Sequence, residues 1–139
     1  MDLYDLKIIG WEYGETMSDD LSIKALEKAS NNRRTQKGIV FHSDRGRGYT
    51  SNKYELKLKE LGIIYSYSRK GCPYDNASME SFNSILKKEL VNHNEYFSFN
   101  EAKILLFEFT LGWYHNKRIH GSLNYRTPNQ TYKNYLLTF

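Results

Sequence analysis

The stretch that decides the fold reads Gly38-Ile39-Val40-Phe41-His42-Ser43-Asp44. Its short, continuous apolar run is typical of a strand that is buried on both faces of a parallel sheet. Asp44 follows this strand directly. Because the catalytic and ligand-binding groups of open α/β sheets gather just beyond the carboxyl ends of the strands, Asp44 is a candidate functional carboxylate.

Strand and helix patterns alternate on either side of this stretch. Residues 7–13 and 63–65 are rich in β-forming side chains and predict two further strands. Helical patterns begin at four typical capping residues, Ser18, Ser51, Asn76 and Ser98. A last short segment opens at Pro128. The alternation predicts an α/β layer with parallel strands and crossover helices. Three strands are few for so many helices, so either another segment pairs with an exposed edge or part of the sheet is missing.

The helix opened by Ser98 is predicted to be long. It begins with the pattern Ser98-Phe99-Asn100-Glu101, which matches a capping box. Apolar side chains then recur on one face as far as Trp113, namely Ala102, Leu105, Leu106, Phe109 and Trp113.

Composition excludes several classes of protein. The formal net charge is +4, which is compatible with a polyanionic partner without being diagnostic of one. Cys72 is the only cysteine, so an intrachain disulfide and a cysteine-rich zinc site are excluded. Charged residues interrupt the apolar N-terminus, which is therefore no signal peptide, and no uncharged apolar run approaches the roughly 20 residues of a membrane span. We expect a cytoplasmic protein.

A second carboxylate could act together with Asp44. Glu80 lies in the first turns of the helix that begins near Asn76, and 35 residues separate the two acids. Carboxylates from a strand end and a helix face can converge on Mg²⁺, and two such ions about 3.5–4 Å apart would promote in-line phosphoryl transfer. Acids at such positions are also commonly solvated, so the spacing alone does not decide between the two readings.

An ordered series of motifs surrounds the two acids. It includes His42-Ser43-Asp44-Arg45-Gly46, Tyr49-Thr50-Ser51, Ser68-Arg69-Lys70-Gly71, Tyr74-Asp75-Asn76-Ala77, Glu80-Ser81-Phe82, Lys87-Lys88-Glu89-Leu90, Trp113-Tyr114, Arg118, His120, Leu123 and Thr127-Pro128. From about Asp2 to Pro128 the chain resembles the catalytic domain of IS3-family insertion-sequence transposases. These are DDE enzymes with an integrase core (retroviral integrase type) of the ribonuclease-H-like superfamily.

The resemblance implies a ribonuclease-H-like α/β fold, truncated and lacking the first two strands. Residues 1–128 would form the C-terminal part of the integrase core, and residues 129–139 a tail. Asp44 matches the second and Glu80 the third of three metal-binding acids. The first acid lies on an earlier strand, and neither Asp2 nor Asp5 matches it. His115 departs from the pattern, because the family usually has Asn after Trp-Tyr.

The resemblance and the charge pattern together give candidate DNA contacts. Arg69 and Lys70 lie in a glycine-containing loop before the Glu80 helix and are expected to contact phosphates. Lys87 lies two helical turns after Glu80 and would either approach DNA or be a solvated lysine, which is the favoured reading for Lys88. Asn83 would either bond Glu80 or DNA or lie at the surface. Arg118, with His120, is either part of a structural clamp or a phosphate contact. His42, which adjoins a predicted buried strand, is expected to be a hydrogen-bonded core residue.

The functional prediction is a fragment of a DDE transposase catalytic domain, whose parent performs DNA cleavage, strand transfer and DNA integration. The resemblance implies a two-metal Mg²⁺ or Mn²⁺ site, which we expect to be weak or absent here, so that the chain is inactive alone. The alternative is a non-catalytic DNA-binding or assembly subunit that modulates full-length transposase. Expected partners are transposon ends, target DNA, and a second copy or full-length transposase. The expected location is the bacterial cytoplasm at the nucleoid, without membrane association.

Overall fold

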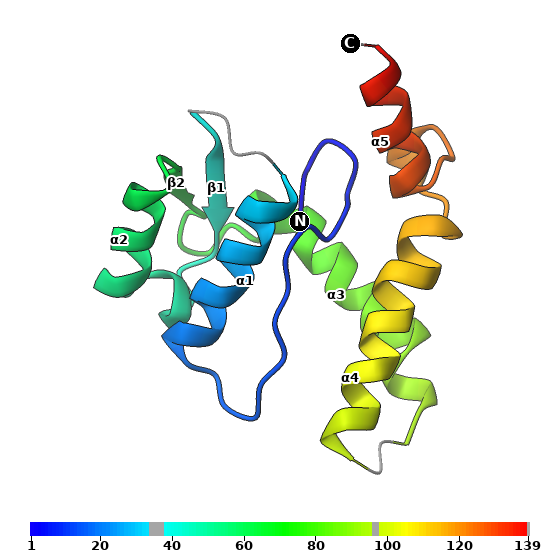
Figure 1. The fold of residues 1–139 in the computed structure, drawn as a ribbon, viewed down its shortest axis with the longest axis horizontal. Coiled ribbons are helices and arrows are strands. Elements are labelled where there is room, and N and C mark those ends of the chain that lie inside the picture. Colours follow the sequence, from blue (N-terminus) through cyan, green and yellow to red (C-terminus); the bar gives the residue numbers. More distant parts are fainter. Residues whose placement is uncertain (34–37, 96–97, 139) are drawn as a thin grey trace. The chain divides into compact units, whose positions relative to one another are not determined.

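A computed structural model describes residues 1–33, 38–95 and 98–138 of the chain (Figure 1). These residues form two compact units. The first combines Met1–Ile8 with Ser81–Phe139, and the second is Ile9–Glu80. In the described part of the chain, no helix is long and apolar enough to cross a membrane.

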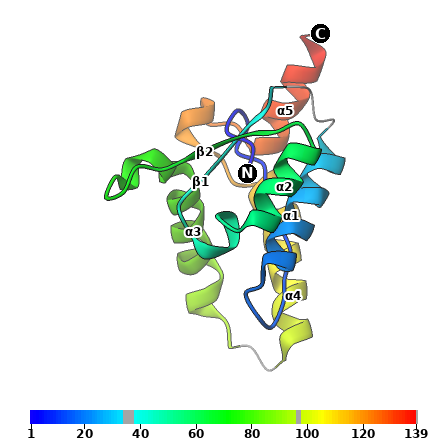
Figure 2. The same cartoon turned by 90° about the vertical axis from the view of Figure 1, so that its left-hand side faces the viewer.

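The unit Ile9–Glu80 contains a small parallel sheet. Strand β1 (Val40–Ser43) pairs with β2 (Ile64–Tyr67), and α2 (Asn52–Glu60) connects them, as predicted for a crossover unit. The preceding helix α1 (Asp19–Asn32) lies beside α2 in both views of the ribbon (Figures 1 and 2). The core between these elements consists of Leu26, Tyr54, Leu58 and Ile63.

Serine side chains begin both helices of this unit, as the sequence predicts. Ser18 Oγ accepts a hydrogen bond from the Leu21 amide at 3.3 Å, and Ser51 Oγ accepts one from the Tyr54 amide at 3.3 Å. Each bond satisfies a backbone donor that has no partner within its own helix. Gly62, whose φ is +66°, follows the end of α2 and allows the left-handed turn into β2.

The strand predicted over residues 7–13 does not form. This segment packs along α1 instead, and Gly10 comes so close that an added Cβ would lie 2.3 Å from the Ala25 carbonyl oxygen. Asn32 Nδ2 donates to the Ile9 carbonyl at 2.8 Å, and Glu12 pairs with Lys28 at 2.7 Å. The β-forming side chains favour an extended backbone, but a strand also needs a neighbouring strand, and no described strand pairs with this segment.

The prediction that the first paired strand is buried on both faces is also wrong. β1 begins at Val40 rather than Gly38, and its register partner across the sheet is Ile64. These two side chains share one face and are 59% and 57% exposed. On the opposite face Phe41 packs against Tyr54, with ring centroids 5.6 Å apart. The chain therefore covers only one face of its sheet.

The other unit is mainly helical. It contains most of α3 (Ala77–Glu89), α4 (Phe99–Phe107) and α5 (Pro128–Leu137). Ser98 caps α4 as predicted, accepting from the Glu101 amide at 3.1 Å, and α5 opens at Pro128 behind a Thr127 capping box. The long helix predicted from Ser98 changes character: after Phe107 it continues as a π-helical segment, η4 (Glu108–Tyr114), which buries Phe109, Thr110 and Tyr114. Short 3₁₀ turns in the chain are η1 (Arg47–Tyr49), η2 (Pro73–Asn76), η3 (Val91–His93) and η5 (Gly121–Leu123).

Candidate functional site

Asp44 lies immediately beyond the carboxyl end of β1 and is exposed, as expected for a functional acid of an α/β sheet. Its Oδ1 accepts a hydrogen bond from the Gly46 amide at 2.8 Å. A Cβ added to Gly46 would lie 2.8 Å from the same oxygen, so only glycine leaves the carboxylate this position. Burial and the nearby charge of Asp44 raise the pKa of Tyr49.

Glu80 is exposed in the first turn of α3, which follows directly on η2. A negative side chain at the N-terminus of a helix is favoured by the helix dipole. Asp44 and Glu80 belong to the same compact unit, Ile9–Glu80. Residues 1–33, 38–95 and 98–138 contain no group of three or more His, Cys, Asp or Glu side chains arranged to hold a metal ion.

The strand end next to Asp44 is fixed by hydrogen bonds. The two ring nitrogens of His42 lie 3.1 Å from Ser66 Oγ and 3.1 Å from Ser68 Oγ. The half-buried ring is thus satisfied by hydroxyl groups of β2 and the residue after it, which confirms the prediction of a structural histidine. Arg45 Nε also donates to the Ser68 carbonyl at 3.3 Å. These bonds join the two strand ends from which a site at Asp44 would be built.

Of the two predicted phosphate contacts in the loop after β2, Arg69 has an intramolecular partner. Its Nε and Nη2 donate to the two carboxylate oxygens of Asp75 at 3.1 and 3.2 Å, and its amide donates to Asp75 Oδ2 at 2.9 Å. These bonds lower the pKa of Asp75 to about 2. The Arg69 side chain is nevertheless 78% exposed, and Lys70 beside it is exposed as well. This pair cannot be predicted from the sequence, because a separation of six residues in a loop has no fixed geometry.

The remaining predicted DNA contacts lie in the other unit. Asn83 and Lys87 are exposed on α3. Arg118 is more enclosed, with 24% of its side chain exposed, and its Nη2 donates to Glu89 Oε1 at 3.5 Å. Its Nη1 donates to the Ile119 carbonyl at 3.4 Å. Arg118 therefore joins the end of the long helix to α3.

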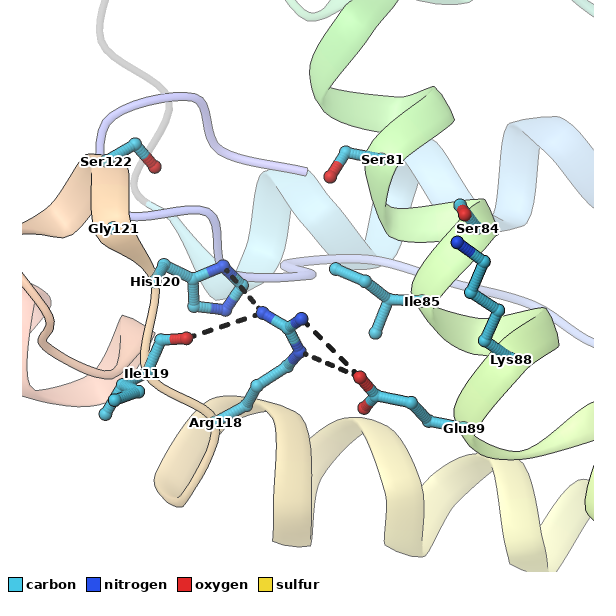
Figure 3. A pocket seen from close by; sticks show the side chains of 10 residues that line it. All are labelled: Ser81, Ser84, Ile85, Lys88, Glu89, Arg118, Ile119, His120, Gly121 and Ser122. Atoms are coloured by element: carbon cyan, nitrogen blue, oxygen red, sulfur yellow. Dashed lines mark hydrogen bonds and ion pairs between the residues drawn. The ribbon is translucent and has the colours of Figure 1, made fainter.

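Arg118 also lines a pocket of about 580 Å³ that lies entirely within this unit (Figure 3). One wall is the face of α3 that carries Lys88 and Glu89, and the other is the turn formed by residues 118–122. Lys88 is exposed on α3 and also lines this pocket. Its place in the pocket depends on the turn, which lies 30 residues further along the chain, so helical periodicity could not reveal it.

Comparison with known proteins agrees with this fold. The sequence profile of one Integrase core domain family matches residues 1–73, and a second Integrase core domain profile matches residues 61–128. The fold resembles a chain in the cryo-EM structure of a simian T-cell lymphotropic virus intasome in complex with PP2A regulatory subunit B56 gamma. That likeness has a TM-score of 0.62 at 17% identity, covering 85% of this chain and 41% of the other.

The chain belongs to the integrase core family and has its ribonuclease-H-like α/β fold. Within that family its relatives are transposases of IS3-type insertion sequences. It is 38% identical over 128 residues to the transposase for IS904 of Lactococcus lactis, covering 92% of this chain and 51% of the relative. It is 32% identical over 130 residues to transposase InsF of IS3A from Escherichia coli, covering 94% and 45%. The chain thus spans about half the length of these relatives.

Proposed function

We propose that the chain carries part of the catalytic site of a DDE-type DNA strand-transfer enzyme, with Asp44 and Glu80 as carboxylate ligands of a divalent metal ion. One observation carries this proposal. Both acids are exposed, at the strand end and helix start where such a site is built, and neither has an ion-pair partner among the described residues. Other acids of the same unit, such as Glu12 and Asp75, are paired with cations.

The oxygen atoms of the two carboxylates are the type of ligand that a hard divalent cation prefers. Mg²⁺ and Mn²⁺ prefer oxygen ligands, and Mg²⁺ is commonly held by one or two carboxylates together with water and substrate phosphates. Bound there, the ion would stabilise the charge that develops on a phosphoryl group during in-line displacement. The Gly46 amide orients Asp44, leaving its other oxygen for a ligand.

Cationic and polar side chains would hold the DNA. Arg69, Lys70 and Lys87 are exposed, and with Asn83 and Arg118 they form the proposed DNA-contacting set. Contacts of lysine and arginine to phosphates give affinity that falls with salt and carries little sequence information. Transposon ends and target DNA, the substrates implied by the resemblance, are the proposed ligands, in the bacterial cytoplasm at the nucleoid.

We expect this chain to be inactive alone. The DDE arrangement uses three acids, and by resemblance Asp44 and Glu80 match only the second and the third of them. We also propose that residues 1–128 form the integrase-core part of the chain and that residues 129–139 form a tail.

Metal binding tests the proposal directly. Mn²⁺ should broaden the NMR signals of residues around Asp44 and Glu80, and Asp44→Asn and Glu80→Gln should each weaken this effect. Glu15→Gln removes an exposed acid of the same unit and should leave it unchanged. Broadening that persists in both site variants would refute the assignment of the ligands. Nicking of end-containing DNA by the chain alone, abolished by Asp44→Asn, would refute the expected inactivity.

A non-catalytic assembly subunit is the second candidate function, and the exposed apolar face of the sheet supports it. Val40 and Ile64 form that face, and exposed apolar sheet surface favours association with another chain. On this reading the chain pairs with a second copy or with a full-length transposase. Association should then weaken in Val40→Lys and be unaffected by Glu80→Gln. Association that depends on Glu80 and not on Val40 would contradict this reading.

A further inference from the structure

Two residues that line the pocket, Arg118 and His120, each carry a buried nitrogen without a hydrogen-bond partner among the described residues. His120 is only 8% exposed, and its Nε2 has no hydrogen-bond partner among the described residues. Within that same part of the chain, Arg118 Nε also has no partner in hydrogen-bond geometry, although it lies 3.5 Å from Glu89 Oε1 as an ion pair. Buried polar atoms are nearly always hydrogen-bonded, so two unpartnered nitrogens on residues that line one pocket make this pocket a candidate ligand site.

The contacts of His120 fix which kind of ligand atom is required. His120 Nδ1 lies 3.4 Å from Arg118 Nη1, as Figure 3 shows. A guanidinium group can only donate, so Nδ1 is the acceptor of that contact and the proton of the neutral ring lies on Nε2. Burial and the charge of Arg118 lower the pKa of His120, which keeps the ring neutral. The unpartnered Nε2 is therefore a donor and needs an acceptor.

We propose that this pocket binds a phosphate group, with His120 Nε2 and the Arg118 guanidinium as donors and Lys88 as a second positive charge. A phosphate offers several acceptor oxygens to converging donors, and arginine favours such planar, charge-assisted contacts. Among the described residues, Glu89 is the only acid lining the pocket, and it pairs with Arg118. A phosphate would compete with Glu89 for the guanidinium.

The turn that presents His120 is held in place before any ligand arrives. The His120 amide donates to the Arg126 carbonyl at 3.1 Å, and the Tyr125 amide donates back to the His120 carbonyl at 2.9 Å. The imidazole packs edge-on against Tyr114, with ring centroids 5.1 Å apart. Donors held in this way lose little freedom when they bind, which favours affinity.

The phosphate could come from the DNA backbone or from free phosphate. Arg118 belongs to the proposed DNA-contacting set, so a DNA phosphate as the ligand rests on the proposed function. Binding of phosphate by the pocket does not depend on it. The proposal assigns new roles to His120 and Lys88, and it requires neither Asp44 nor Glu80.

NMR of the His120 ring, with the whole chain at neutral pH, tests the proposal. Inorganic phosphate and a short DNA duplex are titrated in separate arms. We expect a saturable shift of the ring signals in both arms, weakened about tenfold or more by Arg118→Gln and by Lys88→Gln. Lys103→Gln, which removes an exposed lysine of α4, is the matched control and should have no effect. Lys88 is exposed, so Lys88→Gln carries the test if Arg118→Gln fails to fold.

The possible outcomes separate the two proposals. A shift of the His120 signals with inorganic phosphate and not with DNA would support phosphate binding in the pocket. It would refute the DNA backbone as the source of that phosphate. DNA binding that leaves the His120 signals unchanged, with no shift by phosphate, would refute the pocket while leaving the DNA-binding function intact. A shift that keeps its full affinity in both Arg118→Gln and Lys88→Gln would also refute the assignment.

Discussion

The Ile8 amide donates a hydrogen bond to Nε2 of His115 over 2.9 Å, although 107 positions separate the two residues. His115 is only 3% exposed, so this bond replaces water for a buried backbone donor. It ties the first residues of the chain to the end of the π-helical segment. The resemblance implies Asn at this position, and the histidine found here has a specific structural partner.

Replacing His115 by alanine should therefore destabilise the unit that contains it. An unsatisfied buried donor costs about 1–3 kcal/mol, to which the lost packing of the ring adds. Urea unfolding would measure this loss, and hydrogen exchange at the Ile8 amide should accelerate. His93→Ala, at an exposed position, is the control and should change neither. Unchanged exchange at Ile8 in His115→Ala would contradict the role given to the bond.

Gly46→Ala should weaken metal binding without unfolding the protein. The backbone of Gly46 has φ −59° and ψ 144°, which alanine adopts easily, so the added methyl group acts mainly on the nearby Asp44 oxygen. Disturbing a group that orients a ligand typically costs about tenfold or more in metal affinity. Mn²⁺ titration and thermal unfolding would be compared with Gly112→Ala, whose added Cβ meets nothing within 4 Å. Equal Mn²⁺ affinity in both variants would count against Asp44 as a ligand.

Asp75→Asn should strengthen DNA binding by releasing Arg69. The freed guanidinium would add about one phosphate contact, making the slope of log affinity against log salt steeper by about 0.9. Glu15→Gln makes the same change of charge at an exposed acid of the same unit and should alter the affinity much less. Binding to a short duplex at several salt concentrations would measure both. A slope that Asp75→Asn does not change would remove Arg69 from the DNA-contacting set.

The same ion pair gives a prediction for acid pH. The pKa of Asp75 falls from 3.8 to about 2 because Arg69 stabilises the carboxylate in the folded chain. A depressed pKa means that the pair contributes its stability above pH 3.8 and loses it as the pH falls towards 2. Carboxyl NMR should show Asp75 titrating near pH 2, and in Arg69→Gln its pKa should return towards 3.8. A normal pKa in the unmodified chain would show that the pair does not persist in solution.

Leu58→Ala should destabilise the unit Ile9–Glu80 far more than Leu56→Ala. Both residues belong to α2, but Leu58 is 1% exposed and Leu56 is 64% exposed. Removing a buried leucine costs about 2–5 kcal/mol, whereas a surface substitution usually stays within about 0.5 kcal/mol. Equal losses in denaturant unfolding would show that the core formed by Leu26, Tyr54, Leu58 and Ile63 is not built as described.

The features that could be predicted from the sequence depend on neighbours along the chain. The sequence predicts helix starts at Ser18, Ser51 and Ser98 because a cap bonds a backbone amide three residues on. Asp44 was placed at a strand end for a similar reason, because the apolar run before it is continuous. A local pattern is complete within a few residues, so no knowledge of the fold is needed to interpret it.

The features that were missed depend on distant partners. Residues 7–13 have the side chains of a strand, but α1 rather than another strand lies beside them. The pair of Arg69 with Asp75 and the bond from Ile8 to His115 join positions without any fixed helical or strand spacing. The π-helical segment was missed because its apolar positions also satisfy an α-helical period over a short stretch.

That segment determines where the side chains after it point. Its backbone bonds span five residues: the His115 amide donates to the Thr110 carbonyl, and the Arg118 amide donates to the Trp113 carbonyl. A π turn accommodates one residue more than an α turn, and each residue of an α-helix rotates the chain by about 100°. Deleting one residue from Glu108–Tyr114 would restore the α-helical period and swing Arg118 away from Glu89. The one additional residue in the π-helical segment thus sets the orientation of the proposed phosphate pocket. No residue of Glu108–Tyr114 is among the described residues that line this pocket.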